Sequence, residues 1–404
     1  MRILHTSDWH LGRTFHGSDL TAAYEQWCDY VVEFTRSENI DALLVSGDVF
    51  DRGIPPVAMV ELLSATLNQI LDHTQVILTS GNHDSAKRLG FTSTLLKSGL
   101  SIRTDSLESD HAVPVFNKDS ELGAYVYALP YLDPDVERRR LSPDPEQLLG
   151  RSHESVTRRA IERIFHDIQN STASANVPIL AMAHSFIVGA EPSDSEQDLH
   201  IGGINSVPSG VFQPPKNVPG FDYVALGHLH GPQAVGTLHD PLMRYSGSPL
   251  AFSFSEENHH KSSVLLDFSE ATTNPDSGAR FEPKLELIPT PIYHPIATVR
   301  DSFSELISGK YSDFSEHFLR IYVTDDERPR NLVARLRKVF PNVIEVHHDI
   351  PTVTLRTDAI RASKQNPLDV IDEFYETSGG RPLSVEEKAL VTRLWDEVKN
   401  RGQR

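Results

Sequence analysis

The chain has 404 residues, of which 39% are hydrophobic and 23% are charged, a composition that fits a globular protein with two or three domains. Its formal net charge of −18 argues against a dedicated nucleic-acid-binding protein, which is usually basic, although it does not exclude local basic patches or charge-compensating metal ions. The single cysteine, Cys28, excludes an internal disulfide, and without a run of about 18 apolar residues we expect no transmembrane helix.

Residues 2–6 predict a β-strand, which is followed by Asp8 and His10. The strand begins without the basic and apolar regions of a signal peptide, so we expect a protein of the reducing cytoplasm. Side chains two residues apart on extended backbone point the same way, so Asp8 and His10 can reach one ion; the alternative is a surface turn with an Asp–His hydrogen bond. Arg13 could face a phosphate, although a lone arginine is more often solvated.

A predicted helix over residues 22–37 leads into an apolar strand over 41–46, which ends in a glycine and Asp48. A second helix is predicted over 55–72, where two prolines open it and apolar residues repeat at helical spacing. Its apolar stripe is a core face or, in part, a dimer contact with a helix near residues 89–96.

The strand predicted over residues 75–80 runs into Gly81-Asn82-His83-Asp84. This turn places an amide, an imidazole and a carboxylate at the sheet edge where open α/β sheets keep their ligand sites. A polar turn in which glycine supplies a positive φ is the alternative interpretation. Lys87 and Arg88 lie in the approach to the following helix.

The next part of the chain is less informative. Short strands are predicted within residues 100–130, and the polar, proline-containing stretch 133–150 predicts an excursion from the core. A helix over 154–170 follows, and we interpret its arginine-rich side as a solvated face.

Two further strands end in histidine. Residues 177–183 lead to His184, and residues 221–226 lead to His228 and His230 in a G-H-x-H pair. A lone histidine at a strand end is usually structural, whereas such a pair after an apolar strand is far more specific. The polar, glycine-rich stretch 193–209 between them suits an active-site loop.

A strand over residues 262–268 completes a predicted first domain, 1–270, and the Ser/Thr/Asn/Pro/Gly-rich stretch 269–278 predicts a boundary. Beyond it we expect a small α+β domain, 279–362, in which no catalytic cluster is evident. Its predicted strands lie at 296–299, 318–323, 343–346 and 353–355, and its predicted helices at 302–308 and 329–340.

The tail, residues 366–400, predicts two short amphipathic helices. The first ends near residue 377, and the last opens with a capping box at Ser384 and carries Leu390, Leu394 and Trp395. Two such helices bury little surface alone, so they either pack back on the body or dock a partner.

The side chains at the strand ends form a candidate metal set: Asp8, His10, Asp48, Asn82, His184, His228 and His230. Oxygen and imidazole ligands without a thiolate suit Mn²⁺, Fe²⁺ or Zn²⁺. Seven ligands are too many for one tetrahedral ion but suit two ions that share a carboxylate, the arrangement that promotes in-line phosphoryl displacement. His83 is then free to donate to a phosphate oxygen or a leaving alkoxide, with Asp84 fixing its tautomer. The chain has neither a P-loop nor a G-x-S-x-G elbow, so ATP hydrolysis and serine-hydrolase chemistry lack support.

In the order D-x-H, G-D, G-N-H-D, H and G-H-x-H, these residues resemble the calcineurin-like metallophosphoesterases over roughly residues 1–268. The resemblance implies an α/β fold, a β-sandwich of two sheets flanked by helices, with two metal ions. It implies that Asp8, His10, Asp48 and His230 hold one ion, and that Asp48, Asn82, His184 and His228 hold the other. Asp48 would therefore bridge the two ions.

Four longer stretches are similar to the bacterial SbcD family, the nuclease subunits of SbcCD complexes: Asp8-Trp9-His10-Leu11-Gly12-Arg13, Gly81-Asn82-His83-Asp84-Ser85, Ser193-Asp194-Ser195-Glu196 and Tyr245-Ser246-Gly247-Ser248-Pro249. This similarity implies a Mn²⁺-dependent 3′→5′ double-strand exonuclease and single-strand or hairpin endonuclease, acting in DNA repair, recombination and replication. It also implies a nucleoid-associated homodimer, formed through helices near 55–72 and 85–98, within a heterotetramer.

The same similarity implies that residues 279–362 cap the nuclease domain and contact DNA, and that the C-terminal helices bind the coiled-coil base of the SMC-like ATPase SbcC. Candidate DNA contacts are Arg13, Lys87 and Arg88, and candidate partner contacts are Leu390, Leu394 and Trp395. Archaeal and eukaryotic relatives carry a histidine three residues after the bridging aspartate. This chain has Asp51 at that position, so we do not assign the role of that histidine to it. The acidic charge predicts weak, salt-dependent DNA binding by this chain alone.

Two other functions compete with a DNA nuclease. A small-molecule phosphodiesterase or phosphatase could use the same metals. This hypothesis predicts a closed pocket, and such an enzyme would need neither a capping domain nor a tail. A non-catalytic scaffold predicts lost ligands, and none of the seven is lost.

Overall fold

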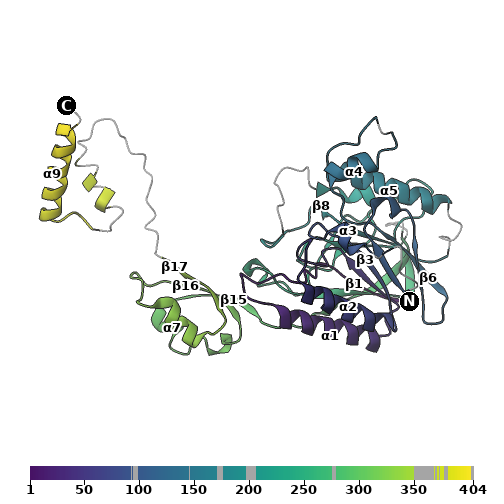
Figure 1. Ribbon diagram of the computed structural model, residues 1–404, viewed down its shortest axis with the longest axis horizontal. Helices are drawn as coiled ribbons and strands as arrows, with labels where there is room; N and C mark the ends of the chain where they lie inside the picture. The colour runs from purple at the N-terminus through teal and green to yellow at the C-terminus, as the bar shows by residue number, and fades with distance from the viewer. Residues whose placement is uncertain are drawn as a thin grey trace. The chain divides into compact units, whose positions relative to one another are not determined.

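The computed structural model describes residues 1–91, 93, 99–144, 146–170, 176–196, 206–274, 279–349, 368, 371–372, 374–376 and 381–401. The chain divides into two compact units (Figure 1). The first comprises Met1–Thr298 with Glu316–Phe318, and the second comprises Val299–Ser315 with Leu319–Arg404. In the described residues, no helix combines the length and the apolar character needed to cross a bilayer.

The first unit contains two six-stranded mixed sheets. The first sheet has the order β14-β13-β1-β2-β3-β4, from β1 (Arg2–Thr6), β2 (Ala42–Ser46), β3 (Gln75–Thr79), β4 (Leu100–Arg103), β13 (Ser262–Asn274) and β14 (Ala279–Pro289). The second has the order β11-β12-β10-β7-β6-β5, from β5 (Val113–Phe116), β6 (Leu122–Ala128), β7 (Ile179–His184), β10 (Tyr223–Gly227), β11 (Gln233–Val235) and β12 (Met243–Tyr245). In the first sheet β1 to β4 are parallel, and the antiparallel strands β13 and β14 form one edge. In the second sheet the four central strands are parallel, and β11 and β5 are antiparallel at the two edges. A small parallel pair joins β8 (Phe186–Ile187) to β9 (Ser206–Val207).

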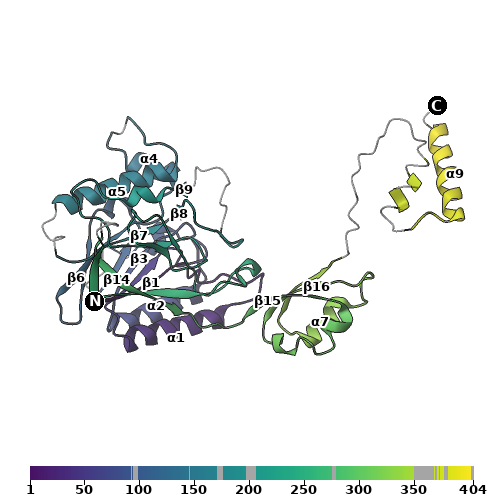
Figure 2. The ribbon, with the colours of Figure 1, turned by 180° about the vertical axis from the view of Figure 1, so that it is seen from behind.

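The two sheets pack face to face, and helices cover their outer faces. Alternate strand residues form the core between the sheets, among them Ile3, Leu44, Ile77, Leu180, Met182, Tyr223 and Leu266. Figures 1 and 2 show α1 (Thr21–Ser37) and α2 (Val57–Leu71) side by side over the first sheet, and α4 (Pro134–Arg140) and α5 (His153–Asn170) over the second. The buried face of α5 forms a second core with β7 and β10. This architecture confirms the predicted two-sheet α/β sandwich.

Parallel pairing brings the ends of five strands to one edge of the molecule. β1, β2 and β3 run in register in the first sheet, and β7 and β10 pair in the second so that His184 lies opposite Gly227. The Ser46 hydroxyl at the end of β2 donates to the Ala225 carbonyl of β10 at 3.0 Å, which links the two sheets at this edge. The turns that follow these strands therefore lie close together.

The domain boundary expected at residues 269–278 is corrected by the strand pairing. β13 and β14 form a hairpin in which Asn274 pairs with Ala279, and β14 belongs to the first sheet, so the first unit continues to Thr298. Ser, Thr, Asn, Pro and Gly favour a hairpin turn for the same physical reasons that they favour a linker, so composition alone did not distinguish the two.

The second unit is built around the three-stranded sheet of β15 (Ile296–Asp301), β16 (Phe318–Val323) and β17 (Val343–His348). Its helices are α6 (Phe303–Leu306), α7 (Leu332–Val339) and α9 (Val385–Arg401).

The predicted strand at 353–355 lies outside the described residues. Of the helix expected near 89–96, the described part is α3 (Ala86–Leu89) with the few residues that follow it. Short 3₁₀ turns lie at Ser106–Glu108, Ser209–Phe212, Phe254–Glu256 and Ser312–Phe314.

The buried carboxylate of Asp222 ties the β13–β14 hairpin to the second sheet. It accepts the backbone N–H groups of Ile179 at 2.8 Å, Arg280 at 2.7 Å and Phe281 at 2.9 Å. Asp222→Ala leaves three amides without an acceptor, so we expect the free energy of unfolding to fall by roughly 3 kcal/mol or more in urea denaturation. Asp222→Asn keeps one acceptor oxygen and should lose less; equal stability of the alanine variant and the wild type would contradict this role.

Candidate metal centre

The seven predicted ligands converge at the shared edge of the two sheets. They come from the turns after β1 (Asp8, His10), β2 (Asp48), β3 (Asn82) and β10 (His228, His230), and from the last residue of β7 (His184). Asp8, His10, Asp48, His184 and His230 are almost fully buried, whereas Asn82 and His228 are partly buried. The ligand atoms of Asp8, His10, Asp48, His184 and His230 form overlapping groups of three, one of which includes His83, and within each group these atoms lie within 4.8 Å of one another.

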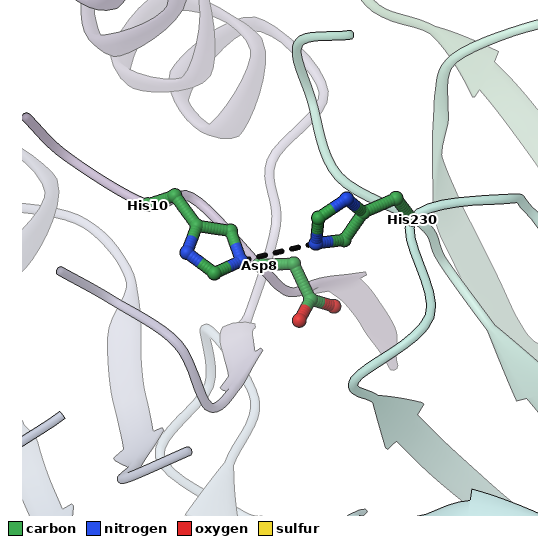
Figure 3. Close-up of side chains that lie close together, drawn as sticks. All are labelled: Asp8, His10 and His230. Atoms are coloured by element: carbon green, nitrogen blue, oxygen red, sulfur yellow. Dashed lines mark hydrogen bonds between the residues drawn. The ribbon is translucent and has the colours of Figure 1, made fainter. Parts of the chain in front are cut away.

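One group consists of Asp8, His10 and His230 (Figure 3). The Nε2 atoms of His10 and His230 are 3.1 Å apart, and the Asp8 carboxylate lies beside them. The carboxylate also accepts the backbone N–H of His228 at 3.0 and 3.1 Å, which joins the turn after β1 to the turn after β10. Two imidazole nitrogens and a carboxylate oxygen are a suitable set for one divalent cation.

Asp48 lies between this group and the remaining ligands. Its Oδ2 atom is 3.6 Å from His10 Nε2 and 3.4 Å from His184 Nε2. The Asn82 amide oxygen lies 2.9 Å from His184 Nε2 and 3.1 Å from His228 Nδ1. This arrangement brings Asp48, Asn82, His184 and His228 together and leaves Asp48 shared with the first group.

Burial perturbs the titration of these groups strongly. Burial raises the pKa of Asp8 to about 6, with the Asp48 carboxylate adding to the effect. Burial alone would raise the pKa of Asp48, but His184 and His10 hold it well below its usual range. Burial works against the charged form of His184, but Asp48 and Asp8 raise its pKa to about 9. Burial lowers the pKa of His228 to about 3, so this ring is kept neutral, as a metal ligand must be.

The donor set fits divalent cations. It offers buried carboxylate, amide and imidazole atoms without a thiolate, and the described residues supply no lysine or arginine to neutralise Asp8 and Asp48 directly. The His184 Nδ1–H donates to the Ser46 carbonyl at 2.9 Å, which turns its Nε2 atom toward Asp48 and Asn82, at 3.4 and 2.9 Å. The centre is therefore built to hold cations rather than to pair its own charges.

The backbone at the ligands explains the glycines of the motifs. Asp8, His10, Asp48 and His228 have positive φ angles of 53°, 45°, 47° and 107°, a strain typical of functional sites. A Cβ atom on Gly81 would lie 2.1 Å from Asp48 Oδ1, and one on Gly227 would lie 1.8 Å from the Ser46 carbonyl. Glycine is required at position 81 because the turn after β2 lies against it, and at position 227 because β2 of the other sheet does.

His83 lies at the rim of the centre, where its backbone N–H donates to Asp48 Oδ1 at 2.8 Å. Its Nδ1–H donates to the Asp51 carbonyl at 2.8 Å, so the tautomer is fixed by that carbonyl and not by Asp84 as expected. Asp84 instead accepts the N–H groups of Val49, Phe50 and Gly81 at 2.9–3.0 Å and holds the turns after β2 and β3 together. Burial, together with the Asp48 charge, raises the pKa of Asp84 to about 7.

The three basic residues expected near a phosphate differ in their surroundings. Arg13 is mostly buried: its guanidinium donates to the Ser195 carbonyl at 2.5 Å and lies 4.9 Å from the centre of the Phe252 ring. Arg88 is exposed and donates to the Gly53 carbonyl at 2.7 Å, and Lys87 is exposed. Arg13 therefore supports the loops of the centre, whereas Lys87 and Arg88 face solvent.

Sequence reasoning missed the residues behind His230. Ser195, Glu256 and Lys261 form a buried network there, although 66 positions separate the first from the last. Ser195 lies in a stretch noted only as a motif, and neither Glu256 nor Lys261 belongs to a recognisable pattern.

Comparison with known proteins identifies both parts of the chain. A family model described as calcineurin-like phosphoesterase matches residues 1–232, which is more than half of the 404 residues. The SbcD C-terminal model, described as type 5 capsule protein repressor C-terminal domain, matches residues 292–378. These matches confirm the resemblance that the motifs predicted.

Two solved structures are similar at low identity. The protein TT1561 of Thermus thermophilus is 13% identical, with a TM-score of 0.37, and the match covers 71% of this chain and 98% of that chain. GAP50, the anchor in the inner membrane complex of Plasmodium, is 12% identical, with a TM-score of 0.39 and coverage of 87% and 98%. Neither score is high enough to carry an argument.

The close approach at Gly81 gives a test of the centre. In Gly81→Ala the added Cβ collides with the Asp48 carboxylate and displaces it, so we expect Mn²⁺ affinity in calorimetric titration to fall at least about tenfold. Gly210→Ala is the matched control, because nothing lies within 4 Å of the Cβ it adds. Unchanged Mn²⁺ binding by Gly81→Ala would show that Asp48 is not a ligand.

Proposed function

The chain belongs to the calcineurin-like phosphoesterase family, and on that premise we propose that it is the nuclease subunit of an SbcCD-type complex, hydrolysing phosphodiester bonds in DNA. The observation that carries the proposal is the position of the buried Asp48 carboxylate between His10 and His184, at the edge where both sheets present ligands. The SbcD C-terminal match at residues 292–378 supports DNA as the substrate among phosphoesters in general.

We propose that the centre binds two divalent ions, preferably Mn²⁺. Asp8, His10, Asp48 and His230 would hold one, and Asp48, Asn82, His184 and His228 the other. Such ions supply a nucleophilic water at neutral pH and neutralise the charge that develops on the phosphate. The protein contributes fixed ligand positions in a buried, strained framework, which need no rearrangement when the substrate binds.

His83 is the residue that we assign to the leaving group. Its Nδ1–H is held by the Asp51 carbonyl, so Nε2 is the ring atom left to carry and deliver a proton. General acid catalysis of this kind contributes about 10²–10⁴-fold to a rate. Asp84 is a positioning residue in this scheme, because it anchors the turn that carries His83.

The remaining parts of the chain receive roles from the same proposal. Within the region 279–362, the residues that belong to the second unit would cap the active site and contact DNA, and Lys87 and Arg88 would also contact DNA. The proposed activities are 3′→5′ exonuclease on duplex ends and endonuclease on single strands or hairpins. A homodimer through α2 is supported by the exposure of Val57 (72%) and Val60 (44%) on that helix.

The test is Mn²⁺-dependent cleavage of a labelled linear duplex and a hairpin at low salt, with and without the SbcC-type ATPase and ATP. We expect cleavage, stimulated by the ATPase. Bis(p-nitrophenyl) phosphate is assayed in parallel, and its hydrolysis without DNA cleavage under any condition would instead support the alternative of a small-molecule phosphodiesterase.

His83→Ala sharpens this test. We expect the variant to bind Mn²⁺ as the wild type does and to cleave DNA at least about 100-fold more slowly. His111→Ala, at an exposed histidine, should behave as the wild type. His83 also lies within ligand distance of His10 and Asp48, so loss of metal together with activity would show that it is a ligand rather than an acid.

The exposed apolar residues of α9 support a docking role for the tail. Leu390 and Leu394, one turn apart, are 45% and 50% exposed. We propose that this face, with Trp395, binds the coiled-coil base of the ATPase, as a helix does in an apolar groove.

The double variant Leu390→Ser/Leu394→Ser should weaken ATPase binding by at least about tenfold, because each buried leucine is worth about 1.5–3 kcal/mol. Hydrolysis of bis(p-nitrophenyl) phosphate should be unchanged. Arg393→Gln, on the same helix, serves as the control. Wild-type affinity of the double variant in a quantitative pull-down would remove α9 from the interface.

A further inference from the structure

A chain of buried hydrogen bonds runs from His230 away from the metal centre. His230 Nδ1 lies 2.5 Å from the Ser195 hydroxyl oxygen, and that oxygen lies 2.5 Å from Glu256 Oε1. The three residues are 2%, 5% and 2% exposed. Solvent does not reach these side chains, so their hydrogen bonds have few alternative partners. The donor and the acceptor of each bond are therefore well determined.

The charge of Glu256 determines which atoms donate and which accept in these hydrogen bonds. Its side chain is almost fully buried and forms an ion pair with Lys261, so the carboxylate is ionised. Its Oε2 pairs with the Lys261 ammonium, and its Oε1 also accepts the backbone N–H of Phe252 at 3.1 Å. Lys261 in turn donates to the Ser248 hydroxyl and to the His230 carbonyl, each at 2.9 Å.

An ionised carboxylate can only accept hydrogen bonds, so the Ser195 hydroxyl must donate its single hydrogen to Glu256. The Ser195 oxygen then has only lone pairs to offer His230, so Nδ1 of His230 must carry the hydrogen. The neutral ring therefore has its lone pair on Nε2, the atom that lies 3.1 Å from His10 Nε2 and faces the Asp8–His10 group.

Other contacts fix the position of the same ring. Glu196 Oε1 accepts the backbone N–H of His230 at 2.7 Å, while Glu196 Oε2 accepts from the Ser193 backbone and hydroxyl. His230 is thus held at its backbone N–H, its carbonyl and its Nδ1. By contrast, His10 Nδ1 has no hydrogen-bond partner among the residues that the structure describes, and the Asp51 carboxylate lies 3.8 Å from it.

We propose that Ser195 and Glu256 are positioning residues that hold His230 in the Nδ1–H tautomer and thereby set the affinity of the Asp8–His10–His230 group for its cation. Lys261 keeps Glu256 ionised, so the network imposes the tautomer without adding net charge beside the centre. The inference rests on the proposed function and deepens it, because it assigns separate control to one of two cation sites.

The experiment titrates Mn²⁺ into the full-length protein and follows bound ions by electron paramagnetic resonance. For Ser195→Ala we expect one of the two ions to bind about 10–100-fold more weakly, the usual effect of removing an outer partner of a histidine ligand, with the other unchanged. Ser195→Thr keeps the hydroxyl and should restore binding. Ser253→Ala is the matched control, because its hydroxyl lies 3.4 Å from the same Glu256 oxygen.

A second measurement reports the tautomer without metal. In ¹⁵N-histidine-labelled, metal-free protein, the His230 ring nitrogens should show a protonated Nδ1 and an unprotonated Nε2, and Ser195→Ala should shift the ring toward the other tautomer. The double variant Glu256→Gln/Lys261→Met removes both buried charges together, so it tests the same link without an unpaired lysine. We expect this double variant to bind the same ion more weakly.

The outcomes separate this inference from the proposed function. Two ions bound by Ser195→Ala with wild-type affinity, or an unchanged His230 tautomer, would overturn the positioning role even if the wild type cleaves DNA. Selective loss of one ion in a protein that never cleaves DNA would uphold the positioning role and reject the nuclease assignment. Thermal melting of each variant shows that binding is compared between folded proteins.

Discussion

The centre depends on burying the Asp48 carboxylate at the edge where the two sheets meet. One oxygen accepts the His83 amide, and the other faces His10 and His184 from opposite sides. A buried charge of this kind is tolerated only with partners, and here the partners are supplied by strands of both sheets. Gly81 has no side chain because the carboxylate occupies that space. The parallel strands, the tight turns and the glycines all serve this one placement.

Acidic residues away from the ligands hold this placement. Asp84 fastens the turns after β2 and β3, Glu196 fastens the His230 backbone, and Asp222 fastens the β13–β14 hairpin, each through backbone N–H groups. These bonds offset strained ligand conformations that cost about 1–3 kcal/mol each. Part of the net charge of −18 therefore lies on internal structure and not on a repulsive surface, which eases the conflict between an acidic chain and the proposed DNA substrate.

The sequence was sufficient to predict the main strands and the side chains that meet at their ends, because short apolar runs followed by Asp, Asn or His mark both. Local patterns failed where the deciding contact was distant. The stretch 269–278 has the composition of a linker, but its residues up to Asn274 belong to β13, which pairs with β14. Asp84 was expected to fix the tautomer of His83, but the Nδ1–H of that ring donates to the Asp51 carbonyl. Glu256 is 61 residues from Ser195, a separation at which no periodicity or motif operates.

The bond between the His228 amide and Asp8 spans 220 positions, and this has a consequence for biosynthesis. A ribosome delivers Asp8 early and His230 only after most of the first unit has been made, so the nascent chain holds half a centre for much of its synthesis. An incomplete ligand set binds cations weakly, and a fragment terminated before residue 228 lacks His228 and His230 altogether. Such fragments never carry the complete centre.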